Sequence, residues 1–167
     1  MEKKTEENLT NAFAGESQAH MKYLAFADKA EKENFENVAR LFRANAFAEQ
    51  VHATNHLRTL SGISKTEENL QAAIAGETFE VEEMYPAYMS VAKEQNEPGA
   101  ETTIRWALEA EKVHAGLYKK AKEAVTQGKD ADMAAIHVCQ VCGFTVEGDA
   151  PDICPVCGSP KQRFTKF

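Results

Sequence analysis

Hydrophobic and polar residues follow a helical period along most of this chain. From residue 1 to about 127, Ala, Glu, Lys and Leu dominate, Pro and Gly are sparse, and apolar residues recur every three or four positions. Breaks in the pattern fall at 31–34, 61–64 and 96–99, and Gly128 is a helix stop. The pattern therefore predicts four helices, at about residues 5–30, 34–60, 65–95 and 100–127.

The last fifth of the chain has a different pattern. Residues 128–135 have the composition of a linker. From Ile136 onward the segments are short, contain Gly, Pro and Cys, and lack a helical period. The sequence thus predicts two domains: a four-helix bundle with its linker over residues 1–135, and a small metal-binding domain over residues 136–167.

The helical region contains an internal repeat. The triplet AGE at 14–16 recurs at 75–77, and AEQVH at 48–52 recurs as AEKVH at 110–114, with offsets of 61 and 62 residues. We interpret the region as two copies of one helical hairpin. Each copy supplies a Glu on its first helix and a Glu-x-x-His pair on its second helix.

Each predicted helix carries an acidic residue at the centre of its apolar stripe. These central residues, with their neighbours on the same faces, are Glu16, Glu49 with His52, Glu77 with Glu80, and Glu111 with His114. Several unpaired carboxylates cannot be buried without positive charge, and no Lys or Arg on these stripes is placed to supply it. Large apolar residues expected to form the core around them include Phe35, Val38, Tyr88 and Val91.

Two metal ions would supply the missing positive charge. A single Glu-x-x-His is usually a coincidence on a solvated face, but two in register with two further central glutamates are not. One Glu from each of two helices, with Glu-x-x-His from each of the other two, is the di-iron carboxylate pattern of ferritin-like bundles. Carboxylate and imidazole ligands suit iron or manganese.

Other inward-facing residues have simpler expected roles. We expect His20 and His56 to be hydrogen-bonded core histidines rather than ligands. We expect Tyr23 and Tyr85 to be packing residues whose hydroxyls can bond ligand carboxylates. Trp106 lies off its stripe, as a partly exposed residue or a contact with a partner or with the C-terminal domain.

All four cysteines lie in the small C-terminal domain. Cys139 and Cys142 form one C-x-x-C-Gly loop, and Cys154 and Cys157 form a second. Two such loops present four thiolates to one ion in a tetrahedral site. A structural zinc ribbon and a one-electron iron carrier both use this spacing, and a redox-active bundle beside it favours iron.

Charge and the N-terminus restrict the partners. The 167 residues carry a net charge of −7, which argues against nucleic acid and anionic membranes. The opening MEKKTEEN has no apolar stretch typical of a signal peptide, and no apolar run approaches the length of a membrane span. We expect a cytoplasmic protein.

The chain resembles rubrerythrins over nearly its whole length. The motifs that carry the resemblance are AGESQAHMKY (14–23), AEQVH (48–52), GETFEVEEMYP (76–86), AEKVH (110–114) and the paired CQVCG and CPVCG segments. The resemblance implies an all-α ferritin-like four-helix bundle followed by a rubredoxin-like Fe(Cys)4 domain. It further implies an oxo-bridged di-iron centre, one mononuclear iron in the four-cysteine site, and two-electron reduction of hydrogen peroxide to water.

Ligand roles carry over through the matching motifs. The resemblance implies that Glu49 and Glu111 bridge the irons. It also implies Glu16 with His52 or Glu80 on one iron, and Glu77 with His114 on the other. Glu80, His52 and Tyr23 would be the catalytic residues, with one iron moving between His52 and Glu80 as its oxidation state changes. In the first repeat, the 61-residue offset places Ala19 opposite Glu80, so only one iron has this extra carboxylate.

Electrons would enter through the rubredoxin-like iron. An external donor is implied, such as rubredoxin and its NAD(P)H-dependent reductase. Two other functions fit part of the pattern. A ferritin-like ferroxidase that stores iron would use the carboxylates but has no use for a thiolate electron carrier. A bundle with a structural zinc ribbon would use the cysteines for protein binding.

The connection between the second and third predicted helices is short. In ferritin-like folds the connection at this point crosses the full height of the bundle. That height is about 40 Å for a helix of roughly 28 residues. That span needs roughly twelve extended residues, and the break at 61–64 offers far fewer. Either the bundle is a plain up-down-up-down one, or the last two helices pack on the first two of a second protomer. We favour the domain-swapped homodimer.

Overall fold

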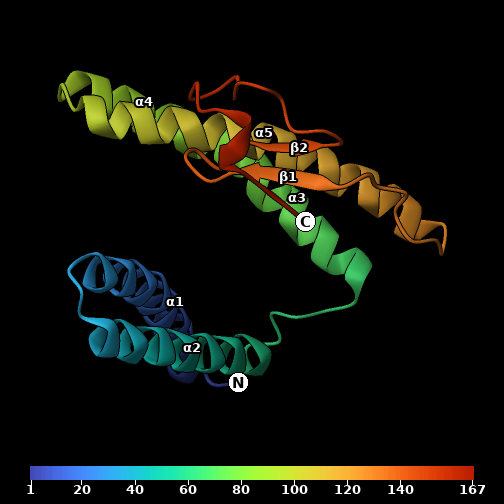
Figure 1. Cartoon of the computed structure of the whole chain (residues 1–167). Coiled ribbons are helices and arrows are strands. Elements are labelled where there is room, and N and C mark those ends of the chain that lie inside the picture. Colours follow the sequence, from blue (N-terminus) through green and yellow to red (C-terminus); the bar gives the residue numbers. More distant parts are fainter. The chain divides into compact units, whose positions relative to one another are not determined.

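The computed structural model describes residues 1–167 and divides them into two compact units, Met1–Ser64 and Lys65–Phe167 (Figure 1). Each unit is built on a helical hairpin, so the four long helical segments predicted from the periodicity are present. No helical segment combines the length and the apolar content that a membrane span requires.

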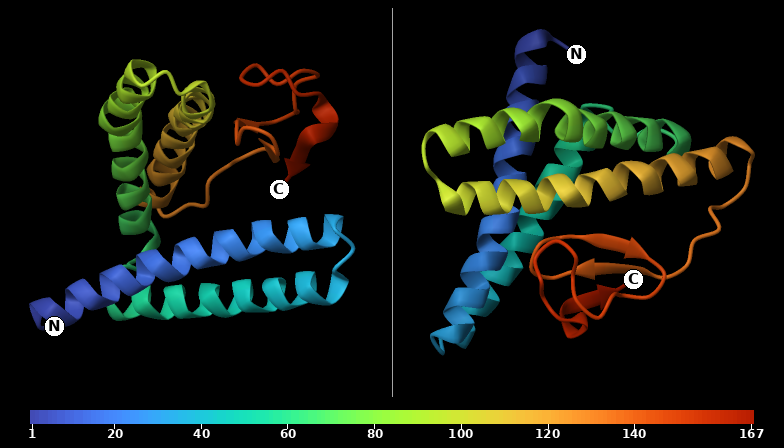
Figure 2. Two further views of the ribbon diagram at one scale, coloured as in Figure 1. Left: turned by 90° about the vertical axis from the view of Figure 1, so that its left-hand side faces the viewer. Right: turned by 90° about the horizontal axis from the view of Figure 1, so that it is seen from above.

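The first unit is an antiparallel hairpin of α1, Lys3–Lys32, and α2, Glu36–Thr59 (Figure 2). Asn34 makes the turn with φ 66°, a left-handed conformation that asparagine tolerates better than most residues. The Phe35 N–H donates to the Ala30 carbonyl at 2.8 Å and closes the turn. The buried side chains are small, which lets the two backbones approach closely; they are Ala27, Ala30, Ala39, Ala46 and Ala53.

The second unit begins with another hairpin. Its first arm runs through α3, Thr66–Phe79, the π-helical turn η1, Glu80–Met84, and α4, Tyr85–Glu94; its second arm is α5, Pro98–Thr126. The arms are joined by a turn in which Asn96 has φ 56°. Asn96 lies 62 residues after Asn34, so the repeat seen in the sequence extends to the turns.

The π-helical turn corrects the prediction of one regular helix over residues 65–95. In the first repeat Tyr23 follows Glu16 by seven residues, whereas in the second Tyr85 follows Glu77 by eight. The second hairpin therefore carries one extra residue. A π turn holds more residues than an α turn and absorbs the insertion, and such turns are frequent at functional sites. Glu80 is the first residue of this turn.

A small antiparallel sheet completes the second unit. Its strands are β1, Ile136–Cys139, β2, Thr145–Glu147, and β3, Phe164–Lys166, in the order β2-β1-β3. Val138 of β1 pairs with Thr145 on one side and with Thr165 on the other. A 3-10 turn, η2, at Lys161–Arg163 precedes β3.

The sheet region is joined to α5 by polar contacts. Lys120 of α5 forms an ion pair with Glu147 of β2 at 2.7 Å. Arg105 of α5 donates to the Val156 carbonyl at 3.1 Å. The cysteine-containing region is therefore docked on a helix that also carries predicted metal ligands.

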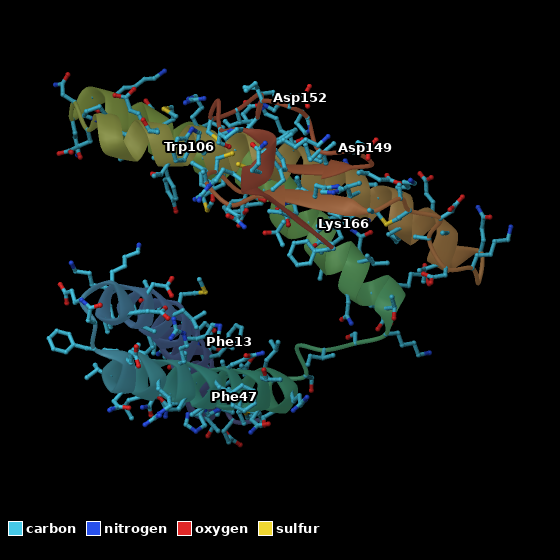
Figure 3. All side chains as sticks on the ribbon, in the orientation of Figure 1. Phe13, Phe47, Trp106, Asp149, Asp152 and Lys166 are labelled. Atoms are coloured by element: carbon cyan, nitrogen blue, oxygen red, sulfur yellow. The ribbon has the colours of Figure 1, made fainter.

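Large apolar side chains remain exposed on both hairpins. Phe35 and Tyr88, which we expected in the core, are 57% and 53% exposed, and Val38 and Val91 are also exposed. Phe47, labelled in Figure 3, is 67% exposed. Each arm has only one helical neighbour within its unit, so much of its apolar face stays uncovered. The prediction that these residues are buried is thus wrong for the single chain.

Candidate metal centres

The first unit brings three predicted ligands together. Glu16 comes from α1, and Glu49 and His52 come from one turn of α2. His52 Nδ1 lies 3.1 Å from Glu16 Oε2 and 3.6 Å from Glu49 Oε2. The two carboxylates are mostly buried, whereas the His52 side chain is 54% exposed. We call these three residues the first cluster.

The second unit repeats this arrangement with Glu77 of α3 and with Glu111 and His114 of α5. His114 Nδ1 lies 2.5 Å from Glu111 Oε2 and 4.0 Å from Glu77 Oε2. His114 is better covered than His52, with 28% of its side chain exposed. In both clusters the same imidazole nitrogen, Nδ1, faces the carboxylates. We call these three residues the second cluster.

Each cluster places two carboxylates within hydrogen-bonding reach of each other. The hydrogen bond between Glu16 and Glu49 lowers the pKa of Glu16 and raises the pKa of Glu49. Burial, and then the hydrogen bond with Glu111, raise the pKa of Glu77 to about 7. Each pair therefore shares a proton more readily than two separate carboxylates would.

The donor atoms of each cluster suit a metal ion. The two carboxylate oxygens and the imidazole nitrogen of each set lie within 4.8 Å of one another. Ionised carboxylates can only accept hydrogen bonds, and their mutual repulsion is relieved by a cation placed among them. Oxygen and imidazole donors of this kind suit iron and manganese.

Two further residues lie beside the second cluster. Burial, and then the charge of Glu111, raise the pKa of Glu80, which places this carboxyl close to the cluster without making it one of the three converging residues. Burial, and then the charges of Glu80 and Glu111, raise the pKa of Tyr85. His52 belongs to the other unit, and its shared role with Glu80 stays a prediction.

The remaining inward residues have ordinary contacts. His20 has the hydrogen-bond partner expected of it, the Ala46 carbonyl at 2.7 Å. His56 Nε2 lies 4.0 Å from Glu16 Oε1, next to the first cluster. Tyr23 stacks at a tilt against Phe26 and Phe42, which fits its expected packing role. Its catalytic role stays a prediction.

Trp106 is partly buried on α5, next to Arg105, and its indole N–H has no hydrogen-bond partner (Figure 3).

The four cysteines form a third cluster. Cys139 Sγ and Cys157 Sγ lie 3.7 Å apart, and Cys142 Sγ and Cys154 Sγ lie 3.6 Å apart. These separations are far longer than a disulfide bond of about 2.05 Å. They match the edge of a tetrahedron with metal–sulfur bonds of about 2.3 Å, which is about 3.8 Å. The geometry therefore fits one tetrahedral ion, and both iron and zinc satisfy it.

The loops that carry these sulfurs are built alike. Gly143 and Gly158 follow the second cysteine of each loop with φ 79° and 76°, a region that favours glycine. Their N–H groups donate to the carbonyls of Cys139 and Cys154, both at 2.9 Å. The sequence C-x-x-C-Gly thus folds into a turn that points two sulfurs to the same side.

One residue near the metal ligands was missed by the sequence interpretation. His114 Nε2 lies 2.7 Å from Thr145 Oγ1, across the contact between α5 and β2. A threonine at the start of a strand is common, so the sequence gives no signal for this contact. Only the docking of the sheet on α5 reveals it.

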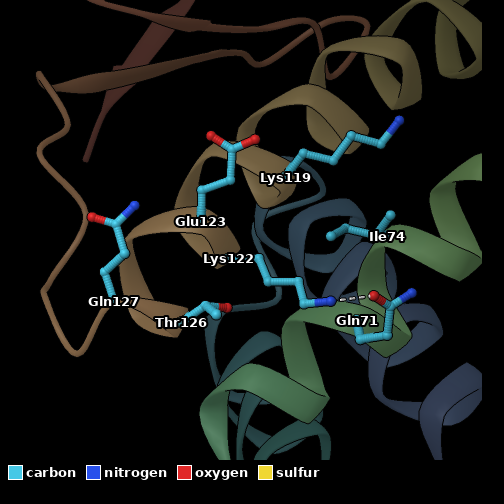
Figure 4. A pocket seen from close by; sticks show the side chains of 7 residues that line it. All are labelled: Gln71, Ile74, Lys119, Lys122, Glu123, Thr126 and Gln127. Carbon is cyan, nitrogen blue, oxygen red and sulfur yellow. Dashed lines mark hydrogen bonds between the residues drawn. The ribbon is translucent and has the colours of Figure 1, made fainter.

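Two cavities of the second unit differ in their relation to the ligands. One, of about 550 Å³, is lined by α3 and by the C-terminal turns of α5, where Lys122 donates to Gln71 (Figure 4). It contains none of the clustered ligands. The other, of about 480 Å³, has His114 and Thr145 in its wall; its remaining lining residues are Leu70, Leu117, Tyr118, Ala121, Met133, Ile136, Val138 and Phe167.

Comparison with known proteins gives the family. The family model described as Rubrerythrin matches residues 7–122, and the model described as Rubrerythrin, rubredoxin-like domain, matches residues 137–165. Rubrerythrin-2 of Clostridium acetobutylicum is 40% identical over 177 residues, which cover 98% of this chain and 96% of that protein. Nigerythrin of Nitratidesulfovibrio vulgaris is 34% identical, with 98% of this chain and 86% of that protein covered.

Solved structures of nigerythrin agree with these matches. Its mixed-valence state and its fully reduced, all-ferrous state each align with a TM-score of 0.54, at 34% and 35% identity, over 98% of this chain and 86% of theirs. The matches confirm the predicted fold class, an all-α ferritin-like four-helix bundle followed by a small rubredoxin-like domain. They also confirm the predicted cofactors, a di-iron carboxylate centre and a four-cysteine iron site. The chain belongs to the rubrerythrin family, whose members are di-iron proteins of oxidative-stress defence.

Proposed function

We propose that this protein is a non-haem di-iron peroxidase that reduces hydrogen peroxide to water. The reaction consumes one peroxide, two electrons and two protons and releases two waters. The observation that carries the proposal is the presence, in one chain, of two carboxylate–histidine clusters and a four-thiolate site. When bound, the metal pair would bind the peroxide oxygens and supply two electrons. The thiolate site would then return two electrons to the metal pair, one at a time.

The residues of the chain divide the work. In this proposal the residues of both clusters hold the metal pair, with Glu49 and Glu111 as bridges. Glu80 and the Tyr85 hydroxyl lie beside the second cluster and would deliver protons to a departing oxygen. Glu80 and His52 would alternate on one iron, because a hard carboxylate suits ferric iron better than imidazole does.

The four thiolates favour electron entry over iron storage. A storage protein has no need of a one-electron carrier, whereas a peroxidase that turns over must be re-reduced twice per cycle. An external electron donor, such as a rubredoxin with its NAD(P)H-dependent reductase, would supply the electrons. Four unpaired thiols also suit a reducing compartment such as the cytoplasm.

Rapid mixing under anaerobic conditions tests the function. Reduced, iron-loaded protein should be reoxidised by hydrogen peroxide much faster than by an equal concentration of oxygen. Glu111→Ala, which removes a proposed bridge, should abolish the fast phase, and the exposed Glu83→Ala should keep it. Reoxidation by peroxide at or below the rate with oxygen would refute the peroxidase.

A spectrum and a metal count test the zinc alternative. Protein purified without oxygen and then oxidised should be red from the four-thiolate iron and contain about three irons per chain. Colourless protein with zinc in the cysteine site would make the small domain a structural ribbon, and the electron route would fail.

The proposed assembly is a domain-swapped homodimer. The segment between α2 and α3 runs from Leu60 to Lys65. At about 3.4 Å per residue it is too short to span the length of a long helix, which is about 44 Å for α5. Exposed side chains such as Phe35 and Phe47 leave an apolar face to cover on the first unit. In this proposal each di-iron site takes its first cluster from one chain and its second cluster from the other.

A further inference from the structure

We propose that Thr145 is a positioning residue that orients His114 for metal binding and ties the four-cysteine region to the second cluster. The electron-transfer part of this inference rests on the proposed function; the ligand-orienting part does not. Among the polar side chains other than cysteine, Thr145 is the one that is buried, with 5% exposed. A buried hydroxyl requires hydrogen-bond partners, and those of Thr145 are His114 of the second cluster and the carbonyl of Gly143 in a cysteine loop.

The Thr145 hydroxyl lies between a backbone carbonyl and a nitrogen of His114. Thr145 Oγ1 donates to the Gly143 carbonyl at 3.1 Å, and a carbonyl can only accept. Both contacts of Oγ1 are hydrogen bonds when the His114 Nε2–H donates to Oγ1, across the 2.7 Å between these two atoms. We propose that the imidazole proton is therefore on Nε2, which leaves the lone pair of Nδ1 free.

The free nitrogen faces the ligand carboxylates. His114 Nδ1 lies 2.5 Å from Glu111 Oε2, with Glu77 Oε2 at 4.0 Å. With Nδ1 unprotonated, acceptor atoms converge on one point, and a metal ion satisfies them all. Histidine ligands commonly have their ring orientation and tautomer set by such a hydrogen bond on the other nitrogen.

The same threonine stands next to the thiolate site along the chain. Its acceptor, Gly143, directly follows Cys142, and the Phe144 amide is within hydrogen-bonding reach of the Cys142 sulfur. One covalent and hydrogen-bonded route thus leads from Cys142 through residues 143–145 to His114. We infer that electrons delivered by the thiolate site reach the second cluster along this route.

The contact is held in place by an ion pair and has mainly apolar surroundings. The Lys120 ammonium contacts both oxygens of Glu147, at 2.7 and 2.8 Å, two residues beyond Thr145. The Glu147 carboxylate also accepts from the Ala134 N–H at 2.9 Å. Around His114 and Thr145 the cavity wall is made almost wholly of aliphatic and aromatic side chains, where a hydrogen bond is stronger than in water.

The histidine of the first cluster, His52, has different surroundings from His114. Within its own unit His52 makes no hydrogen bond through Nε2, and its side chain is 54% exposed. Thr145 therefore fixes only one of the two repeat-related histidines.

The test replaces Thr145 in the full-length, iron-loaded protein. Thr145→Val keeps the shape and removes the hydroxyl, and Thr145→Ser keeps the hydroxyl. Thr165→Val is the matched control, because Thr165 pairs with Val138 from the other side of β1 and is exposed. Circular dichroism and the visible spectrum of the thiolate iron establish that each variant is folded.

The first measurement is iron retention against a chelator, which needs no peroxide. Thr145→Val should weaken iron binding at the carboxylate site by roughly 10- to 100-fold, with the cysteine-bound iron unchanged. Thr145→Ser and Thr165→Val should stay within about threefold of the parent protein, in line with an intact hydroxyl at position 145. Unchanged retention in Thr145→Val would overturn the orienting role even if peroxide reduction is established.

The second measurement follows the thiolate iron during a single turnover with peroxide. Thr145→Val should slow its reoxidation roughly tenfold or more relative to Thr165→Val, and Thr145→Ser should restore the rate. If Thr145→Ser is as slow as Thr145→Val, the hydroxyl is not responsible and the route is wrong.

Should Thr145→Val fail to fold, the comparison of Thr145→Ser with the parent protein decides, because a serine variant that is slow and iron-depleted refutes the proposal. Should the parent protein fail to react with peroxide, only the proposed function is lost, and iron retention still decides the role of Thr145.

Discussion

Replacing Glu77 by glutamine should have opposite effects on the metal-free and the iron-loaded protein. In the metal-free protein, Glu77 and Glu111 face each other, and burial with this hydrogen bond raises the pKa of Glu77 to about 7. Glutamine copies the protonated acid, since its amide donates to Glu111 at any pH. In the iron-loaded protein the same change removes a negatively charged ligand. If the carboxylate had only a structural role, the substitution would change the stability of the metal-free and the iron-loaded protein in the same direction.

The magnitude follows from the pKa. Because the folded-state pKa of Glu77 lies above the ordinary value of 4.5, the stability it contributes is complete below that value and is lost as the pH rises through about 7. The difference between the folded-state pKa of Glu77 and its ordinary value corresponds to about 3 kcal/mol of unfolding free energy, at about 1.4 kcal/mol for each pKa unit. Solvent screening of this partly exposed carboxyl reduces the expectation to about 1.5 kcal/mol at pH 8. At low pH, near 4.5, parent and variant should be equally stable.

Urea unfolding followed by helical circular dichroism measures both effects. Metal-free Glu77→Gln should exceed the parent by about 1.5 kcal/mol at pH 8, and the iron-loaded variant should fall below the loaded parent. Glu82→Gln, an exposed change in η1, is the matched control and should alter neither state. Equal stability of metal-free parent and variant at pH 8 would refute the shared proton. A loaded variant as stable as the loaded parent would refute Glu77 as a ligand.

Three further predictions concern electron entry, the iron shift and the assembly. Cys142→Ser should abolish turnover with an external donor, yet the chemically reduced variant should still consume about one peroxide per di-iron site; loss of that single turnover would show that the two sites are inseparable. Crystal structures in both oxidation states should show one iron bound by Glu80 when oxidised and by His52 when reduced, and identical coordination would refute the shift. Co-refolding a Glu16→Ala, Glu49→Ala chain with a Glu77→Ala, Glu111→Ala chain should partly restore activity, because a swapped heterodimer regains one intact site; heterodimers without activity would place each site within one chain.

Much of the local structure follows from the sequence because the repeat and the helical period act locally. Glu-x-x-His places both ligands one turn apart on one helix face, and the structure brings His52 and Glu49 together for that reason. The C-x-x-C-Gly loops were equally readable, since a glycine after the second cysteine allows the positive φ of the turn. The π turn was also recoverable from the spacing of Glu77 and Tyr85, but only by comparing the two repeats residue by residue.

Other features depend on contacts between distant segments, which periodicity does not encode. The bond between His114 and Thr145 joins residues 31 positions apart and requires β2 to dock on α5. The exposure of Phe35 and Tyr88 has the same origin. A helical wheel identifies an apolar face but not whether the covering partner belongs to the same hairpin, another unit or another chain.

The two clusters lie on two copies of one helical hairpin, and identical copies would make the two metals alike. The chain departs from its own symmetry at two places near them. One extra residue in the second hairpin produces the π turn that begins with Glu80, and the appended sheet supplies Thr145 to His114 but nothing comparable to His52 within its unit. The first departure provides an additional carboxylate, and the second holds one histidine in place. A site in which one histidine is anchored while the other is free can keep one metal fixed and let the other exchange His52 for Glu80. The proposed redox shift is therefore expected on the iron of His52, and an observed shift on the iron of His114 would contradict the anchoring by Thr145.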